Sequence, residues 1–526
     1  MQGRALQNLV DNSYENRRDI NLTQKQKQRP NIVLIMADDM GFSDCGCYGS
    51  KIDTPNIDNL AGEGLKFTQM YNAARCCPTR ASLLTGLYPH QAGVGDMVGD
   101  LGVGPAYQGY LRKDCVTIAE VLKEAGYTTL MSGKWHVGEE RPHWPTDRGF
   151  DKYFGLISGA ANYFNIEKTK ADGVTRQMAL DGETWTPPED DFYMTDAISD
   201  RAVEFLADYG SGKNPFFLYV PYTAPHWPLH ALPEDIEKYK GKFQEGWDEL
   251  RNKRYENLIE LGIVKEDWFK SPRDEKVKPW KKIENKKEME LKMAIYAAQI
   301  DRMDQGIGRI MNQLEELGEK DNTIVMFLSD NGGCHEGGPF GFDRRGNGLP
   351  PGGEDSYMSY GRSWANLSNT PFRLFKHWVH EGGIATPFVV SWPEKIKDQK
   401  LVESPAYIAD ITATCIDIAD AKYPEKHDGQ EITPLEGESF KDIFSGENWA
   451  RNNPVYWEHE GNCAVRDGKW KLVSRNEKED WELYNMEVDS TELNDLAERK
   501  PEIVEELKQK YYKWADKCGV VQRPIN

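Results

Sequence analysis

Short runs of apolar residues alternate with segments of helical periodicity along most of the chain. The runs are rich in branched aliphatic side chains, which is typical of strands buried on both faces, and they span residues 31–41, 128–136, 214–222, 322–333 and 384–393. Apolar residues recur at helical spacing in the segments 54–67, 117–127, 196–210 and 288–319. Strands that alternate with helices predict an α/β fold with a large mixed, mostly parallel sheet flanked by helices.

The pattern changes after about residue 446. Charged turns separate three short strand-like runs, and a helical segment follows them; these elements span residues 454–460, 463–474, 481–486 and 501–517. This predicts a smaller C-terminal antiparallel sheet with a packing helix. The chain is therefore divided into a polar N-terminal extension (1–30), a main α/β domain (31–445) with a charged insertion at about 231–285, and a C-terminal α+β subdomain (446–526).

Composition excludes some classes of function. The 526 residues are 39% apolar and 29% charged, as in globular proteins, and the net charge is −20, so we expect no nucleic-acid partner. No apolar run approaches the roughly 20 residues that a membrane-spanning helix needs. The first thirty residues lack an apolar signal core, which leaves open a cytoplasmic protein or a chain whose leader is missing.

The nine cysteines are scattered along the chain and odd in number. This spacing is not that of a disulfide framework in a chain of this size. Because no Cys-x-x-Cys pair occurs, the sequence does not favour a structural zinc site either.

Two pairs of polar residues follow predicted strands: Asp38-Asp39 and Asp330-Asn331. Ligands of parallel sheets bind at the carboxyl ends of the strands, where these pairs lie. Oxygen donors without Cys or His suit a hard cation, Ca²⁺ with Mg²⁺ as the alternative. Either pair alone is more typical of turns and helix caps, but both together favour a metal site.

Three further segments carry cations and imidazoles. Lys134 and His136 follow the strand at 128–136 and would point to the same side if its geometry persists, and prolines flank His226 closely. The segment 370–383 offers several such residues, of which we expect one or two to face a site: Arg373, Lys376, His377 and His380. The alternatives are an exposed strand end for Lys134 and His136 and a packing histidine for His226. In the segment 370–383 we expect the remaining residues to lie on the surface.

Two adjacent cysteines, Cys76 and Cys77, stand at the start of a predicted short helix. A helix N-terminus attracts anions, and with Arg75 and Arg80 nearby it would lower the pKa of a thiol there and make it reactive. A cysteine nucleophile would need a histidine base, for which His136 or His226 could serve. The alternative is a buried free cysteine, the commonest state of this residue.

A motif around Cys76 resembles the signature of the type I sulfatases, which belong to the alkaline phosphatase superfamily. It consists of Cys76, Pro78, Arg80, Leu84, Thr85 and Gly86. The resemblance extends over nearly the whole chain, through "LIMADDMG", "GKWHVG", "APHWPL", "SDNGG" and "SWANLSNTPFR". It is closest to bacterial arylsulfatases and carbohydrate sulfatases. The chain departs at Cys77 and Thr79, where serine is common.

The resemblance implies a mechanism and a set of site residues. It makes Cys76 the residue that a maturation enzyme oxidises to Cα-formylglycine, and Cys77 a variable neighbour. It implies a Ca²⁺ site of Asp38, Asp39, Asp330 and Asn331, in which the formylglycine takes part. It makes Arg80, Lys134 and Lys376 cations around the sulfate. His136 would act on a formylglycine hydroxyl and His226 would face the leaving group. Family habit favours a periplasmic or exported protein.

No sequence motif identifies the alcohol part of the substrate. Arg75 precedes Cys76 directly, Glu336 follows the second metal pair, and His459 lies between Glu458 and Glu460 in the C-terminal subdomain. An arginine with a carboxylate suits sugar hydroxyls, so we expect a sulfated carbohydrate such as sulfated galactose or N-acetylhexosamine. The alternatives are a general arylsulfatase acting on small sulfate esters, a phosphomonoester or phosphonate hydrolase of the same superfamily, and an inactive calcium- or glycan-binding relative.

Overall fold

A large mixed sheet forms the centre of the molecule. The computed structural model describes residues 29–168, 176–188, 190–475 and 480–521. The sheet has eleven strands in the order β10-β2-β9-β8-β1-β7-β3-β4-β5-β6, and β11 also pairs with β2. The strands are β1 (Asn31–Ala37), β2 (Leu65–Tyr71), β3 (Thr128–Ser132), β4 (Lys152–Leu156), β5 (Met178–Leu180), β6 (Glu183–Trp185), β7 (Phe216–Pro221), β8 (Thr323–Ser329), β9 (Ala385–Ser391), β10 (Lys400–Val402) and β11 (Ala406–Tyr407).

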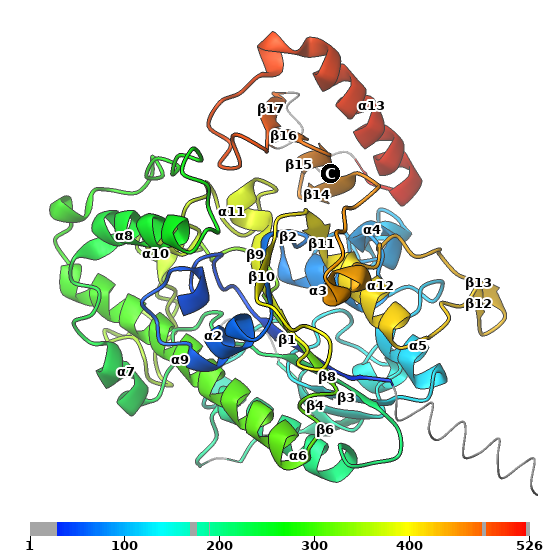
Figure 1. Cartoon of the computed structure of the whole chain (residues 1–526). Coiled ribbons are helices and arrows are strands. Elements are labelled where there is room, and N and C mark those ends of the chain that lie inside the picture. The colour runs from blue at the N-terminus through cyan, green and yellow to red at the C-terminus, as the bar shows by residue number, and fades with distance from the viewer. Residues whose placement is uncertain (1–28, 169–175, 189, 476–479, 522–526) are drawn as a thin grey trace, which may run out of the picture.

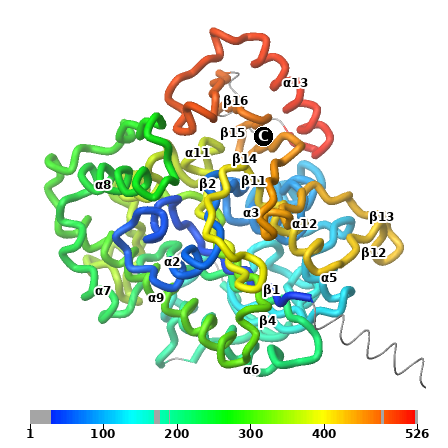
Figure 2. Tube along the Cα trace, viewed as in Figure 1, coloured from blue at the N-terminus to red at the C-terminus, as the bar shows by residue number. Residues whose placement is uncertain are grey.

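The predicted fold class is confirmed. The central strands β8, β1, β7, β3 and β4 run parallel, whereas β9 runs antiparallel to both β8 and β2. All five predicted apolar runs contain a strand of this sheet. β2 begins at Leu65, inside the segment 54–67 whose spacing predicts a helix; the helix α2 itself ends at Gly62. Figure 2 shows β2 beside β11, which lies far along the chain.

Helices cover both faces of the sheet (Figure 1). α2, α6 and α7 pack against α9, the longest helix, and α3 and α5 pack against α12 on the other side. α8 packs against α10. The α-helices of this part of the chain are α2 (Pro55–Gly62), α3 (Cys76–Thr85), α4 (Pro89–Ala92), α5 (Ile118–Glu124), α6 (Met194–Tyr209), α7 (Pro233–Tyr239), α8 (Gly246–Glu260), α9 (Lys286–Glu316), α10 (Gly361–Ser368), α11 (Glu381–Ile384) and α12 (Ile408–Ile418).

A second, four-stranded antiparallel sheet lies at the C-terminal end, as predicted (Figure 1). Its strands are β14 (Val455–His459), β15 (Asn462–Asp467), β16 (Trp470–Ser474) and β17 (Glu482–Asn485), and α13 (Pro501–Cys518) packs on β15 and β16. Lys471 of β16 joins this sheet to the main body, because its Nζ lies 2.6 Å from Glu381 Oε1 and 2.8 Å from Glu492 Oε1. All three groups are buried, where charges persist only in such pairs.

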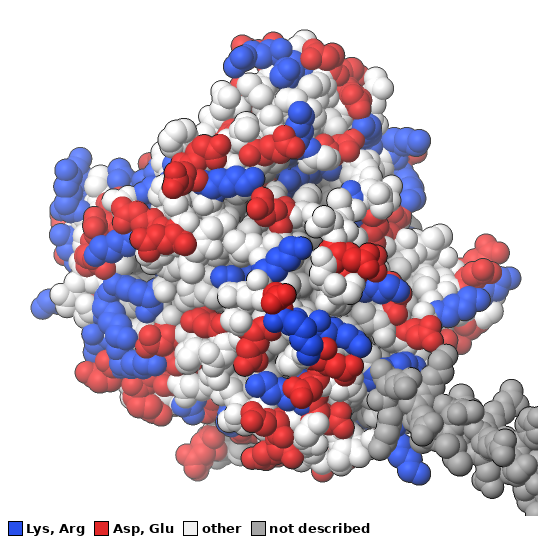
Figure 3. Space-filling view, in the orientation of Figure 1, with Lys and Arg blue, Asp and Glu red and all other residues white. Residues whose placement is uncertain are grey.

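Acidic and basic side chains are interspersed on the molecular face shown in Figure 3. Within the described residues, every helix is too short or too polar to cross a bilayer.

Candidate active site

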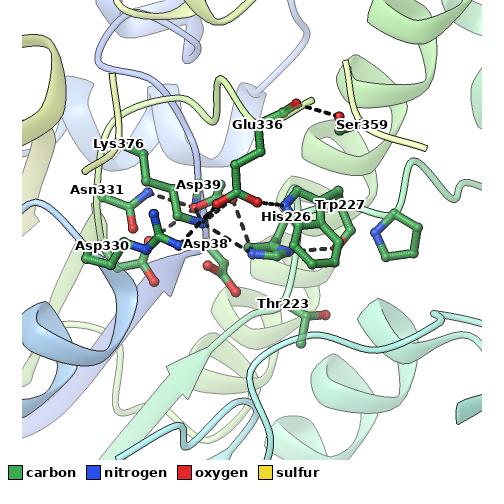
Figure 4. A network of polar contacts seen from close by, with 12 residues as sticks. Asp38, Asp39, Thr223, His226, Trp227, Asp330, Asn331, Glu336, Ser359 and Lys376 are labelled. Atoms are coloured by element: carbon green, nitrogen blue, oxygen red, sulfur yellow. Dashed lines mark hydrogen bonds and ion pairs between the residues drawn. The ribbon is translucent and has the colours of Figure 1, made fainter. Parts of the chain in front are cut away.

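The two acidic pairs meet at the carboxyl ends of neighbouring strands. β1 and β8 are adjacent and parallel, with Ala37 opposite Ser329, so the pairs that follow them lie side by side (Figure 4). The backbone N–H of Asp39 donates to Asp330 Oδ1 at 3.1 Å, and Asn331 Nδ2 donates to Asp39 Oδ1 at 2.7 Å. The strand ends thus gather four oxygen-bearing side chains at one point.

Buried cations surround these carboxylates. Lys134 Nζ lies 2.6 Å from Asp38 Oδ2, Lys376 Nζ lies 2.7 Å from Asp39 Oδ1, and Arg80 Nη2 lies 2.8 Å from Asp330 Oδ2. Each of these six side chains is at most 1% exposed.

The carboxylates of the centre have shifted pKa values. Burial, together with the Asp330 charge, raises the pKa of Asp38 to about 8. Although burial opposes it, the charge of Lys376 and the hydrogen bonds from Asn331 and Lys376 hold the pKa of Asp39 well below its usual range. Carboxyl groups this close ionise together only when a positive charge lies between or beside them.

The residues fit a hard divalent cation. Asp38 Oδ1 and Asn331 Oδ1 are buried and lack a hydrogen-bond partner among the described atoms. Such atoms cost free energy unless something outside the protein binds them. The oxygen donors of the two pairs are those that Ca²⁺ and Mg²⁺ prefer, and Cys76 and His226 border the same space.

Cys76 stands at the first residue of α3 and is 1% exposed. The expectation of a lowered thiol pKa is wrong: burial raises the pKa of Cys76 to about 11, against the opposing effects of Lys376 and Lys134. The desolvation of a thiolate thus outweighs the helix N-terminus and the cations. An unmodified Cys76 is a protonated, weakly nucleophilic thiol at neutral pH.

Lys134 and His136 both reach the site, though not through strand geometry. β3 ends at Ser132, and His136 has a left-handed backbone with φ of 59°. Its Nε2 lies 3.4 Å from the sulfur of Cys77 rather than that of Cys76. Burial and the charge of Lys134 hold the pKa of His136 well below its usual value, so the ring is neutral.

His226 lies in the loop after β7 and touches two members of the centre. Its Nε2 lies 3.3 Å from Asp39 Oδ2 and 3.4 Å from Lys376 Nζ (Figure 4). Its Nδ1 lies 2.6 Å from the carbonyl oxygen of Trp227. A carbonyl only accepts, so Nδ1 carries the proton, and the lone pair of the neutral ring is at Nε2.

Arg75 and Glu336, singled out as substrate residues, are brought together beside Cys76. Arg75 Nη2 lies 3.2 Å from Glu336 Oε1. Glu336 also accepts a hydrogen bond of 2.8 Å from Trp227 Nε1 and lies 3.9 Å from Lys376 Nζ. Sequence reasoning missed the part of Trp227, although its position directly after His226 was a signal.

The C-terminal subdomain contributes a neighbouring cluster that contains His459, one of the expected substrate residues. His459 is fully buried and groups with His377 and Glu460, which were not selected as substrate residues. Glu458 points elsewhere, because its Oε2 lies 2.7 Å from His90 Nε2 in a buried pair.

The segment after α10 divides its polar residues between two places. Lys376 and His377 face the site. Arg373 Nη1 and His380 Nε2 each lie 3.2 Å from Glu482 of the C-terminal sheet. That at most one or two of the four face a site stays a prediction, whereas the expectation that the rest lie on the surface is wrong for His380, which is fully buried.

Comparison with known proteins decides the family. The family model described as Sulfatase matches residues 30–421, and the model described as N-sulphoglucosamine sulphohydrolase, C-terminal, matches residues 372–517. The chain belongs to the sulfatase family. It is therefore an enzyme that hydrolyses sulfate esters, in a family that generally uses formylglycine and a divalent metal.

Relatives of this sulfatase include enzymes named for aryl and for sugar substrates. It is 34% identical to an arylsulfatase of Klebsiella aerogenes, over 80% of this chain and 92% of the relative. It is 28% identical to an N-acetylgalactosamine-6-O-sulfatase of Bacteroides thetaiotaomicron, over 92% and 93% of the two chains. Among solved structures it resembles Ps i-CgsB in complex with k-i-k-neocarrahexaose, with a TM-score of 0.68, 28% identity and 93% of each chain covered.

Proposed function

We propose that this sulfatase removes O-sulfate from a sulfated carbohydrate, such as sulfated galactose or N-acetylhexosamine, with formylglycine formed at Cys76 and a bound Ca²⁺. The observation that carries the proposal is the Arg75–Glu336 pair, 3.2 Å apart, directly beside Cys76. A guanidinium and a carboxylate side by side offer a donor and an acceptor to neighbouring hydroxyls. The name of the N-acetylgalactosamine-6-O-sulfatase relative supports a sugar substrate.

The chain would hold two groups that supply the reactive chemistry. Asp38, Asp39, Asp330 and Asn331 would bind the cation, which acts as a Lewis acid toward oxygen. A formylglycine at position 76 supplies, as its hydrate, two hydroxyls on one carbon, of which one is a nucleophile and the other permits later release of sulfate. Its formation requires a maturation enzyme as partner. An exported location is part of the proposal and rests on the family resemblance alone.

The buried cations would bind the sulfate group. Nitrogen atoms of Lys134, Lys376 and Arg80 form ion pairs with the carboxylate oxygens of Asp38, Asp39 and Asp330 at 2.6 to 2.8 Å. They are preorganised and dehydrated, so they stabilise negative charge that develops on sulfuryl oxygens without reorientation of water.

Two histidines would move protons at opposite stages. Lys376 Nζ donates toward the Nε2 lone pair of His226 at 3.4 Å, so Lys376 and His226 together can deliver a proton to the departing alcohol oxygen. His136 is neutral and buried, and it can take the proton of the second formylglycine hydroxyl when sulfate leaves.

A substrate panel tests the proposed function. Galactose and N-acetylhexosamine sulfates are compared with 4-nitrophenyl sulfate and 4-nitrophenyl phosphate through kcat/KM. We expect at least one sulfated sugar to exceed the aryl sulfate, and sulfate to exceed phosphate. Turnover of the aryl ester alone, or a faster phosphate reaction, contradicts the proposal.

Chelation tests the cation. We expect EGTA to lower activity at least about tenfold. The melting temperature should fall by several degrees, because the acidic pairs then lose a bound counter-charge. Ca²⁺ should restore both quantities. Full activity in protein shown by elemental analysis to be free of Ca²⁺ and Mg²⁺ would exclude a catalytic cation.

A further inference from the structure

A cluster of His377, His459 and Glu460 lies next to the proposed nucleophile. One ligand atom of each residue lies within 4.8 Å of the others. The hairpin between β14 and β15 carries His459 and Glu460, and the backbone N–H of His377 donates to the carbonyl of Ala74 at 2.8 Å. Ala74 stands two residues before Cys76, a chain length of about 7 Å. Arg75, which stands between Ala74 and Cys76, also interacts electrostatically with Glu460, so the cluster borders the segment that leads into residue 76.

His459 has unused hydrogen-bonding capacity in this cluster. It is fully buried, and neither of its ring nitrogens has a hydrogen-bond partner among the described residues. Its Nε2 lies 3.7 Å from Glu460 Oε1, farther than a hydrogen bond. A neutral imidazole offers one donor and one acceptor, and a sugar hydroxyl can serve both. A ligand hydroxyl near Nε2 would reach His459 and Glu460 together.

The same residue types could bind a transition metal, but their hydrogen bonds disfavour this. Asn462 Nδ2 donates to His377 Nε2 at 3.3 Å, so Nε2 accepts and Nδ1 carries the N–H. That Nδ1 lies 3.0 Å from Glu460 Oε2 and donates to it. Both nitrogens of His377 are therefore engaged, and neither offers a lone pair to a metal.

The charges around the cluster favour an uncharged ligand. Glu336 neutralises Arg75 at 3.2 Å. Glu460 and Asp96 both act electrostatically on His459, as Arg75 does. Carboxylates outnumber cations among these residues, so a carboxylate or second sulfate on the ligand would be repelled here.

We propose that His377, His459 and Glu460 bind adjacent hydroxyls of the sugar ring that carries the sulfate ester, and that their surroundings disfavour a second anionic group on that ring. His459 and Glu460 contact the hydroxyls, and His377 positions Glu460. The substrate is then a singly sulfated, otherwise neutral sugar unit. Because these residues would bind the same sugar that the proposed function names as substrate, this inference rests on the proposed function.

A substrate cycle tests the site. The probes are galactose 6-sulfate or N-acetylgalactosamine 6-sulfate, the 4-deoxy analogue and the 4,6-disulfate. We expect His459→Ala to lower kcat/KM on the parent sugar about 10- to 100-fold. The kcat/KM of the wild type should be lower on the deoxy analogue than on the parent sugar by about the same factor. The kcat/KM of His459→Ala on the deoxy analogue should be little lower still. Glu460→Gln should shift the ratio of disulfate to monosulfate turnover about tenfold toward the disulfate.

Matched controls separate the outcomes. His427→Ala, on β12 (Lys426–His427), which lies apart from β14 and β15 in Figure 1, should leave both ratios unchanged. Equal losses of His459→Ala on parent and deoxy sugar would overturn the proposal. So would Zn²⁺ binding by calorimetry that His459→Ala abolishes. If the wild type hydrolyses 4-nitrophenyl sulfate but none of the sugars, the proposed function itself fails. If it hydrolyses the sugars but His459→Ala loses equal activity on the parent and deoxy sugars, only the proposed hydroxyl site fails.

Discussion

Replacing Cys76 with serine should abolish sulfatase activity, whereas Cys77→Ser should retain most of it. In a host that oxidises cysteine but not serine to formylglycine, Cys76→Ser leaves a single hydroxyl at position 76. A serine could accept sulfate once, but it has no second hydroxyl to expel it. We expect kcat to fall by at least about 10³-fold, measured with 4-nitrophenyl sulfate so that binding of the sugar does not enter.

Cys77→Ser is the matched control, because it makes the same substitution at the residue directly after Cys76. It is fully buried, and its sulfur contacts His136 Nε2 at 3.4 Å. A serine hydroxyl there can keep a hydrogen bond to His136, so we expect activity within about threefold of wild type. Mass spectrometry of the peptide should show residue 76 about 18 Da lighter than cysteine in the wild type. Equal losses in both variants, or a permanently unmodified active thiol, would sink the assignment of Cys76.

The two polar pairs of the candidate metal site could be placed at one edge of the sheet from sequence, because parallel strands end at a common edge. Buried parallel strands end at one edge, so Asp38-Asp39 and Asp330-Asn331 had to lie at the same edge. That β1 and β8 are direct neighbours was not predictable, because about three hundred residues and several strands separate them in the chain. Their register, with Ala37 opposite Ser329, brings the pairs into contact.

Elements without a clear pattern were missed. β2 has the sequence LKFTQMY, in which polar residues interrupt the apolar ones, yet all but Gln69 are buried. Elements packed on both faces of the sheet bury β2, and this burial follows from the tertiary structure and not from the local sequence pattern. His377 was one of four equivalent polar residues in its segment, and its backbone, with φ of 91°, sets where its ring lies. No local pattern encodes such a turn.

The pKa of Cys76 shows where local reasoning fails for energetic reasons. The helix start and the nearby cations were identified correctly, but the sequence does not give the depth of burial. Residue 76 is 1% exposed, and at that depth desolvation dominates the thiol pKa. The same correction means that a simple cysteine nucleophile would need a base. His136 contacts Cys77 instead, whereas a ring nitrogen of His226 lies within 4.8 Å of the Cys76 sulfur.

Replacing His226 with alanine should impair hydrolysis in proportion to the basicity of the leaving group. A sugar alcohol leaves as a strongly basic alkoxide unless it is protonated, whereas 4-nitrophenolate leaves without help. We expect kcat on a sulfated sugar to fall about 10³-fold and kcat on 4-nitrophenyl sulfate to fall about tenfold or less. A series of phenyl sulfates should show a steeper dependence of kcat on leaving-group pKa in His226→Ala than in wild type.

Lys376→Met distinguishes proton delivery from sulfate binding. Lys376 Nζ contacts both Asp39 and His226, so its loss removes a charge from the sulfate site as well as the proton donor. We expect this variant to lose activity on the sugar and the aryl ester alike. If His226→Ala instead lowers both substrates equally, His226 only shapes the site around Asp39, and protonation of the leaving group must come from Lys376 directly.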